Sequence, residues 1–83
     1  MKLLYFAQIR EDIGCGSEEY PLPENISDVG ALIDYLRTQG ENYRIAFNNE
    51  DLLRVAVNQT HVNFDHPLQD GDEIAFFPPM TGG

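Results

Sequence analysis

The order of hydrophobic and polar residues along the chain predicts four or five strands and one main helix. Strand-forming and aromatic residues fill the segment KLLYFAQIR at 2–10, which predicts a long, buried first strand. Two glycines in the polar stretch 11–16 then predict a turn. The segment SEEYPL at 17–22 predicts a weaker second strand that forms a hairpin with the first, and Pro21 favours an edge position.

The clearest helix signal follows this hairpin. Ser27 is a good N-cap residue, and Asp28 would lie near the positive end of the helix dipole. Gly40 is expected to end the helix in a left-handed conformation. The apolar residues recur at the spacing of one helix face, which predicts a helix packed against a sheet: Val29, Leu32, Ile33 and Leu36.

The second half of the chain predicts a short helix with a weak signal and three further strands. Alternation is clearest in LLRVAVN, where Leu53, Val55 and Val57 face one way. Turn-like residues lie at 48–51, at Asn58-Gln59 and at Asp70-Gly71. The predicted segments are a helix over 41–47 and strands over 52–58, 61–64 and 73–77.

This order of elements predicts an α+β fold of the β-grasp (ubiquitin-like) type. A mixed four- to five-stranded sheet is crossed by one main helix, which joins two strands that run parallel. We expect a domain over residues 1–77 and an extended C-terminal tail over residues 78–83. An iron–sulfur ferredoxin shares this architecture but needs four cysteines, and this chain has one.

Charge and cysteine content narrow the class of protein. Fourteen acidic residues against five basic ones give a net charge of −9, which argues against nucleic-acid binding because such binding needs clustered Lys or Arg. The same charge disfavours an anionic membrane surface, and no apolar run approaches the length of a membrane span. The single cysteine, Cys15, fits a reducing compartment, so we expect a cytoplasmic protein.

The last six residues carry the most informative pattern in the chain. Pro78 and Pro79 lack backbone donors and favour an extended stem. Gly82 and Gly83 have no side chain, so they fit a channel that excludes other residues. Six residues reach at most about 20 Å, far enough to enter a partner's active site. We therefore expect the whole tail to insert there: Pro78, Pro79, Met80, Thr81, Gly82 and Gly83.

A terminal carboxylate suits group transfer only after activation. Its pKa of about 3.3–3.7 makes it an unreactive anion at neutral pH. An enzyme that uses ATP would convert the Gly83 carboxylate into an acyl-adenylate. A sulfur nucleophile could then displace AMP and leave a thiocarboxylate. The alternative is that the final Gly-Gly is accidental, as terminal residues often are.

Two further features suggest contacts with a partner. Phe76 and Phe77 are adjacent in the last predicted strand, so one should fill the core while the other is exposed to bind a partner. The sequence does not decide between them. An acidic cluster precedes the tail and is either a solvated turn or a docking surface for a basic partner: Asp65, Asp70, Asp72 and Glu73.

No residue pattern predicts a metal site or an independent active site. His61 and His66, with Asp65 between them, supply too few ligands for a metal and are expected to be structural. Cys15 has no obvious cationic neighbour that would activate its thiol.

The chain resembles the small subunit of molybdopterin synthase, the sulfur carrier of molybdenum-cofactor biosynthesis. The similarity is carried by LLYFAQIRE at 3–11 and, more specifically, by VNQTHVNFDHPLQDGDEIAFFPPMTGG at 57–83. The resemblance implies that a ubiquitin-activating-like adenylyltransferase uses ATP to activate Gly83, which becomes a thiocarboxylate. The tail then enters the large synthase subunit, in an expected heterotetramer, and donates sulfur to a cyclic pterin precursor. Two donations build the dithiolene that later holds molybdenum.

The resemblance implies that the chain binds no cofactor and is no enzyme by itself. Two other functions use the same tail chemistry. One is a sulfur carrier for thiamine or tRNA thiolation, although the FFPP stem favours the molybdopterin family. The other is a ubiquitin-like protein modifier, for which the single lysine, Lys2, makes chain formation a poor fit.

Overall fold

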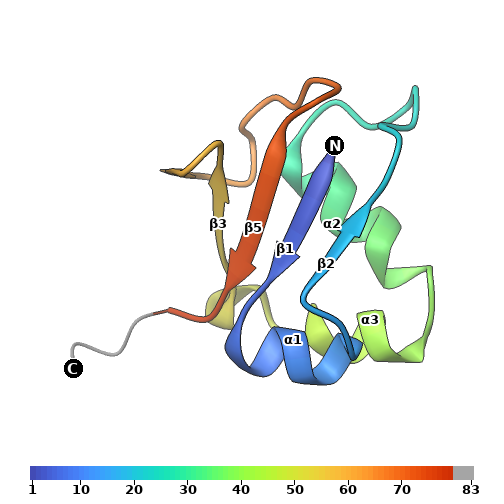
Figure 1. Ribbon diagram of the computed structural model, residues 1–83, viewed down its shortest axis with the longest axis vertical. Helices are drawn as coiled ribbons and strands as arrows, with labels where there is room; N and C mark the ends of the chain where they lie inside the picture. Colours follow the sequence, from blue (N-terminus) through green and yellow to red (C-terminus); the bar gives the residue numbers. More distant parts are fainter. Residues whose placement is uncertain (80–83) are drawn as a thin grey trace.

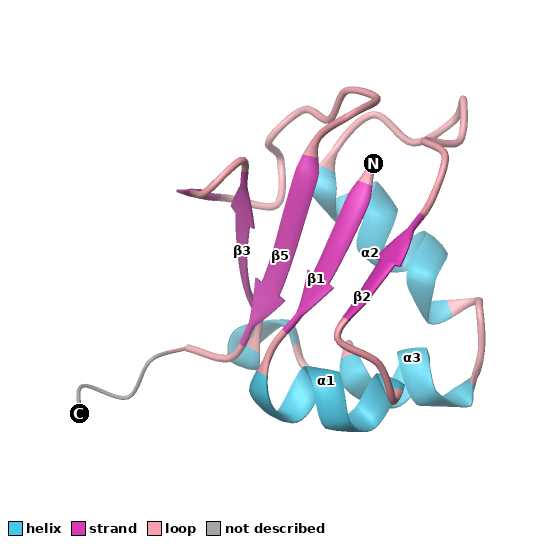
Figure 2. Ribbon diagram, viewed as in Figure 1, coloured by secondary structure: helices cyan, strands magenta, loops and turns pink. Residues whose placement is uncertain are grey.

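A computed structural model describes residues 1–79 and shows a five-stranded mixed sheet with a long helix across one face and the first helix at one end of the sheet (Figures 1 and 2). The strands lie in the order β2-β1-β5-β3-β4. The elements are β1 (Lys2–Tyr5), α1 (Ala7–Ile13), β2 (Ser17–Glu19), α2 (Val29–Arg37), α3 (Glu41–Ala46), the 3₁₀ helix η1 (Glu50–Leu52), β3 (Arg54–Val57), β4 (Thr60–Val62) and β5 (Glu73–Phe77).

The pairing of the strands confirms the predicted β-grasp fold. β1 pairs parallel with β5 and antiparallel with β2, and β3 pairs antiparallel with both β5 and β4. β2 and β3 therefore run in the same direction, and the connection between them carries α2, as expected. The sheet has five strands rather than four.

The prediction of one long first strand was wrong. β1 ends at Tyr5, and the chain then forms α1, so β1 and β2 are neighbours joined by a helix instead of a tight turn. Ile9 and Ile13 lie four residues apart, and both are buried on one face of α1. Gly14, with φ of 96°, ends this helix in the left-handed conformation. Because most of residues 2–10 are apolar, the sequence did not show where the spacing of buried residues changes from that of a strand to that of a helix.

α2 has the predicted apolar face but different ends. The four residues predicted to face the sheet are all buried. The N-cap is Asp28 instead of Ser27: its Oδ1 accepts a hydrogen bond from the Ala31 backbone N–H at 2.8 Å. The helix ends at Arg37 with Thr38 as its C-cap, and Gly40 is extended (φ 161°) and precedes α3. Gly40 therefore does not form the predicted left-handed cap.

Replacing the α2 cap should cost a measurable part of the stability. Asp28→Ala leaves the Ala31 N–H without its acceptor, so we expect a loss of about 1 kcal/mol in the free energy of unfolding. Ser27→Ala is the matched control, because Ser27 lies one residue before the cap and should change little. Denaturant unfolding measures both variants. An equal loss in the two would contradict the assignment of the cap.

The remaining elements follow the prediction with shifted bounds. α3 and β5 lie where the pattern placed them. The predicted turn at 48–51 is partly η1, and β4 begins and ends earlier than the predicted 61–64. Asn58 and Gln59, with φ of 51° and 71°, form the tight turn between β3 and β4.

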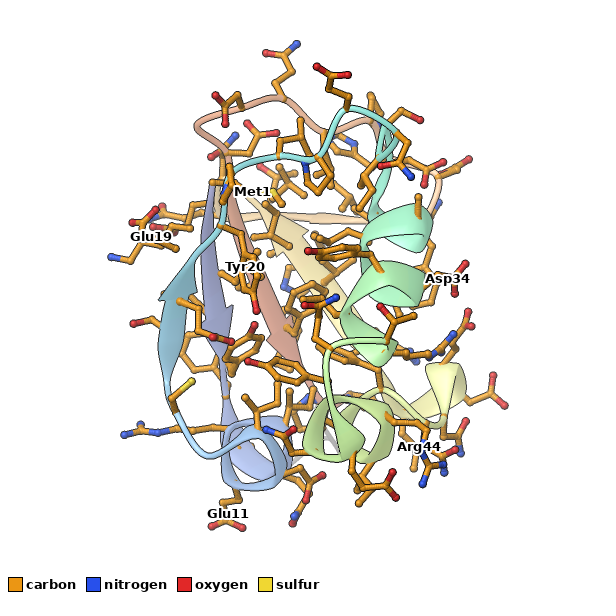
Figure 3. All side chains as sticks on the ribbon, turned by 90° about the vertical axis from the view of Figure 1, so that its right-hand side faces the viewer. Met1, Glu11, Glu19, Tyr20, Asp34 and Arg44 are labelled. Atoms are coloured by element: carbon orange, nitrogen blue, oxygen red, sulfur yellow. The ribbon has the colours of Figure 1, made fainter. Side chains whose placement is uncertain are left out.

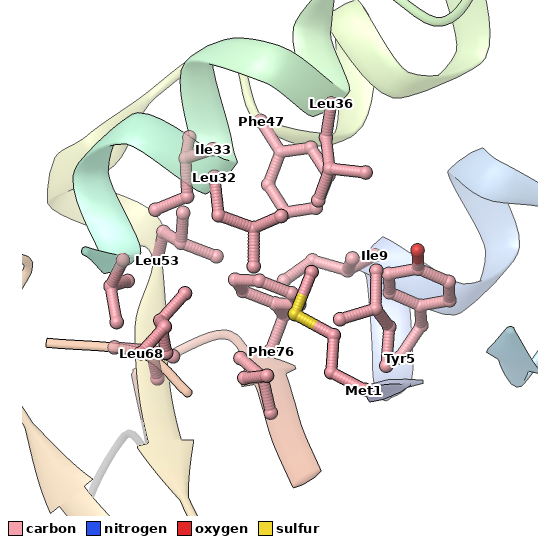
Figure 4. Close-up of a cluster of buried hydrophobic side chains, with 14 of the residues drawn as sticks. Met1, Tyr5, Ile9, Leu32, Ile33, Leu36, Phe47, Leu53, Leu68 and Phe76 are labelled. Atoms are coloured by element: carbon pink, nitrogen blue, oxygen red, sulfur yellow. The ribbon is translucent and has the colours of Figure 1, made fainter. Parts of the chain in front are cut away.

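An aromatic cluster fills the core between the sheet and the helices (Figure 4). The Phe76 ring stacks on Tyr5, with centroids 6.1 Å apart, and meets the edge of Phe47 at 5.0 Å. Leu32 and Leu36 of α2 are also fully buried in this core. Within residues 1–79 no polar or charged residue is buried. No helix in the same range is long and apolar enough to cross a membrane.

Candidate functional site

The predicted stem begins where β5 ends. β5 stops at Phe77 as expected, and the two prolines that follow cannot donate to a neighbouring strand. Pro78 and Pro79 are half-buried, so the base of the stem lies against the domain. The other tail residues lie outside the described residues: Met80, Thr81, Gly82 and Gly83.

The structure resolves the choice between the two phenylalanines of β5. The side chain of Phe76 is fully buried in the core, so it is not free to bind a partner. Phe77 points to the opposite side of the sheet and is partly exposed. Its ring lies 5.1 Å from the ring of His61, between centroids. Of the pair, Phe77 is the candidate for partner binding.

Phe77 belongs to an apolar surface on the side of the sheet that the helices leave free. Figure 3 shows the sheet nearly edge-on, with α2 and α3 on one side and Glu19 pointing away from them. Leu4, Ala75, Ala56 and His61 are cross-strand neighbours in one row of this free side. A shallow hollow lies next to this row, at the base of the stem. We call it the sheet-face patch; it is lined by Phe6, Ala7, His61, Ala75, Phe77 and Pro78.

A second hollow lies on the helical side of the stem, between α1, α3 and η1. We call it the tail-base groove. Its polar lining consists of three amide side chains, those of Gln8, Asn48 and Asn49, and one carboxylate, that of Asp12. Its apolar lining consists of Ile9, Ile45, Ala46, Leu52, Pro78 and Pro79. Pro78 is therefore shared by the groove and the sheet-face patch.

Exposed hydrophobic side chains gather around the stem. Of residues 1–79, three large hydrophobic residues are exposed: Phe6 at 47%, Ile45 at 51% and Leu52 at 61%. Phe6 lines the sheet-face patch, and the other two line the tail-base groove. Clustered apolar exposure on a chain with a net charge of −9 is typical of a surface that binds a partner.

The acidic cluster lies away from the stem, although it precedes the tail in sequence. Asp72 and Glu73 are at the start of β5, whereas the stem leaves its end, about 14 Å further along the strand (Figure 1). Asp72 also accepts hydrogen bonds within the domain, from Asn58 Nδ2 at 2.9 Å and from the Gln69 backbone N–H at 2.8 Å. This geometry favours the structural turn over a docking surface beside the tail.

Cys15 and the histidines do not form a second reactive site in the described part of the chain. Burial raises the pKa of the Cys15 thiol, and the negative charge of Glu18 raises it further, so the thiol is held protonated. No group of three or more His, Cys, Asp or Glu side chains lies close enough within residues 1–79 to hold a metal ion.

The sequence pattern did not identify the exposed side chains around the stem. Phe6 was placed inside the long first strand, which in fact ends before it. In α3, Tyr43 and Ala46 pack against the core and Ile45 does not. Its position outside that face of the helix was the available signal. Leu52 and Leu53 are adjacent, and only Leu53 is buried, so the break in alternation was the available signal.

Comparison with known proteins shows similarity over the whole chain. The ThiS family matches residues 3–83. The Escherichia coli K12 protein named molybdopterin synthase sulfur carrier subunit is 47% identical over 83 residues, which cover 100% of this chain and 99% of that protein. A Pyrococcus furiosus structure described as a putative molybdopterin converting factor, subunit 1, has a TM-score of 0.75 and 34% identity, over 95% of each chain.

A further solved structure contains both subunits of such a system. It is described as a protein–protein complex of subunits 1 and 2 of the molybdopterin-converting factor from Helicobacter pylori. Its TM-score is 0.64 at 24% identity, over 99% of this chain and 96% of that one. At this identity the likeness shows a shared fold.

Proposed function

This chain belongs to the ThiS family and, within it, to the molybdopterin synthase sulfur carrier subunits, and we propose that the carboxylate of Gly83 is the group that carries the sulfur. The observation that carries this proposal is the gathering of exposed apolar side chains around the base of a stem that leads to Gly82-Gly83. Such a surface holds the domain against a partner while the slender tip reaches into its active site.

The proposed chemistry at Gly83 proceeds in three steps. A ubiquitin-activating-like adenylyltransferase joins the carboxylate to AMP from ATP and releases pyrophosphate. Sulfur at the oxidation level of hydrosulfide attacks the activated carbonyl, AMP leaves, and a thiocarboxylate remains. The thiocarboxylate sulfur then bonds to a carbon of the cyclic pterin precursor as a carbon–oxygen bond of the precursor breaks, and water cleaves the resulting thioester to return the carboxylate. The carrier is thereby regenerated, and two such rounds form the dithiolene.

The carrier supplies the sulfur, and its partners supply the catalytic groups. Its principal partner is the large subunit of molybdopterin synthase, in a heterotetramer that holds two copies of each subunit. ATP is used by the activating partner, and the carrier itself binds no cofactor. We expect the carrier to work in the cytoplasm, a reducing compartment that suits its one cysteine.

Purified carrier alone should make no product from the pterin precursor. The two hollows beside the stem hold no nucleophile paired with a base, and the pKa of the single thiol, Cys15, is raised, so we expect catalysis to need the large subunit. The thiocarboxylated carrier is incubated with the precursor, with and without the purified large subunit, and the pterin product is measured. We expect product only in the complete mixture. Product from the carrier alone, or none in the complete mixture, would contradict the proposed function.

A further inference from the structure

The tail-base groove exposes apolar side chains, those of Ile45 and Leu52, to solvent. Asn42 Nδ2 donates to the Ile13 carbonyl at 2.8 Å, which ties α3 to the end of α1. Arg37 Nε donates to the Phe47 carbonyl at 2.9 Å, and Phe47 itself is fully buried. These contacts tie the two ends of α3 to α1 and α2, and Ile45 is exposed beside the groove. The hydrophobic surface of the groove is therefore available without rearrangement.

The position of the groove relates it to the stem. Pro78 lines both the groove and the sheet-face patch, and Pro79 lines the groove alone, so the stem leaves the domain between two apolar surfaces. A channel that admits the tail must surround it. The rim of such a channel meets the domain on both sides of Pro78, and a partner seated on the sheet-face patch alone would leave the groove side of the stem in water.

We propose that the tail-base groove is a second docking surface for the large synthase subunit, filled by apolar side chains at the rim of its channel. This inference rests on the proposed function. Ile45 and Leu52 supply the apolar contacts, and the amide of Asn48 can bond to the partner's backbone. The carrier is then held on both sides of its stem.

The large subunit fits this surface better than the other partners do. A solved relative holds subunit 1 together with subunit 2 of the molybdopterin-converting factor, and the curated relatives are named as synthase subunits, which favours the large subunit as the occupant. Contact on both sides of the stem also buries more area than contact on one. A second copy of this chain bound in the groove would cover Pro79 and obstruct entry of the tail.

A double variant tests the groove without touching the core. Ile45→Gln with Leu52→Gln replaces two exposed apolar side chains by amides, so the melting temperature should stay near that of the wild type. The dissociation constant for the purified large subunit, measured by titration calorimetry, should rise about tenfold. Thr60→Gln is the control: this exposed residue begins β4 and pairs with Val57, at the end of β3 that lies beside the start of β5 and away from the stem, and it should leave the constant unchanged.

Adenylation of the double variant by the activating enzyme is measured in parallel and should proceed at the wild-type rate. A dissociation constant within about twofold of the wild type would overturn the inference. So would a loss seen only with the activating enzyme, or self-association of the wild type that the double variant abolishes. Failure of the wild-type carrier to bind the large subunit at all would instead overturn the proposed function.

Discussion

Removal of Gly83 should leave the fold intact and abolish sulfur transfer. The deletion moves the terminal carboxylate by up to about 3.5 Å, and a misplacement of about 1 Å can already cost a hundredfold in rate. The described sheet and core lie within residues 1–79, so we expect no change in the melting temperature. Thermal unfolding and mass measurement of the thiocarboxylate test the two halves of this expectation.

A chain with one residue added after Gly83 is the matched comparison. It moves the carboxylate by a similar distance in the opposite direction and removes the glycine terminus. We expect neither altered chain to form product, and neither to be thiocarboxylated if the activating enzyme reads the terminus. Sulfuration and near-normal product formation by either one would mean that the terminal carboxylate is not the working group.

The adjacent residues Phe76 and Phe77 should respond to substitution in opposite ways. Phe76→Ala removes a fully buried ring that packs on Tyr5 and Phe47, so we expect a loss of about 3–5 kcal/mol in the free energy of unfolding. A domain of this size has roughly 4–12 kcal/mol in total, so much of the protein would unfold on mild heating. Denaturant unfolding measures the loss.

Phe77→Ala should change stability by less than about 1 kcal/mol and weaken binding of the large subunit about tenfold to a hundredfold. Its ring is partly exposed, so its removal leaves no buried cavity. The two variants differ in position by one residue and share the same chemical change. If Phe77→Ala unfolded the domain while Phe76→Ala did not, the register of β5 described here would be wrong.

The strands and the main helix could be predicted because their apolar residues repeat at a clear period. Leu53, Val55 and Val57 alternate, and all three are buried as expected. α1 could not be predicted in the same way, because only two of its residues, Ile9 and Ile13, are buried, and two positions are too few to show a helical period. The cap of α2 was missed because Ser27 and Asp28 are both good caps, and the loop conformation decides between them.

The tail could be predicted from its chemistry, but the surface around it could not. Two prolines followed by Gly82-Gly83 describe a stem and a slender tip without any knowledge of the fold. The tail-base groove joins Ile9 of α1, Ile45 of α3 and Leu52 of η1, which are distant in sequence. Only the packing of these three elements at the end of the sheet where β5 terminates brings them to Pro78.

Mass measurement of peptides shows where on the chain the transferable sulfur lies, and so tests directly whether Gly83 carries it. The carrier is sulfurated by the activating enzyme with a sulfur source, digested, and its peptides are weighed before and after one turnover with the large subunit. We expect one oxygen to be replaced by sulfur in the C-terminal peptide that contains Gly83, and turnover to restore the oxygen. Cys15→Ser should behave as the wild type does, since burial keeps that thiol protonated. Sulfur found as a persulfide on Cys15, and lost from there on turnover, would contradict the account.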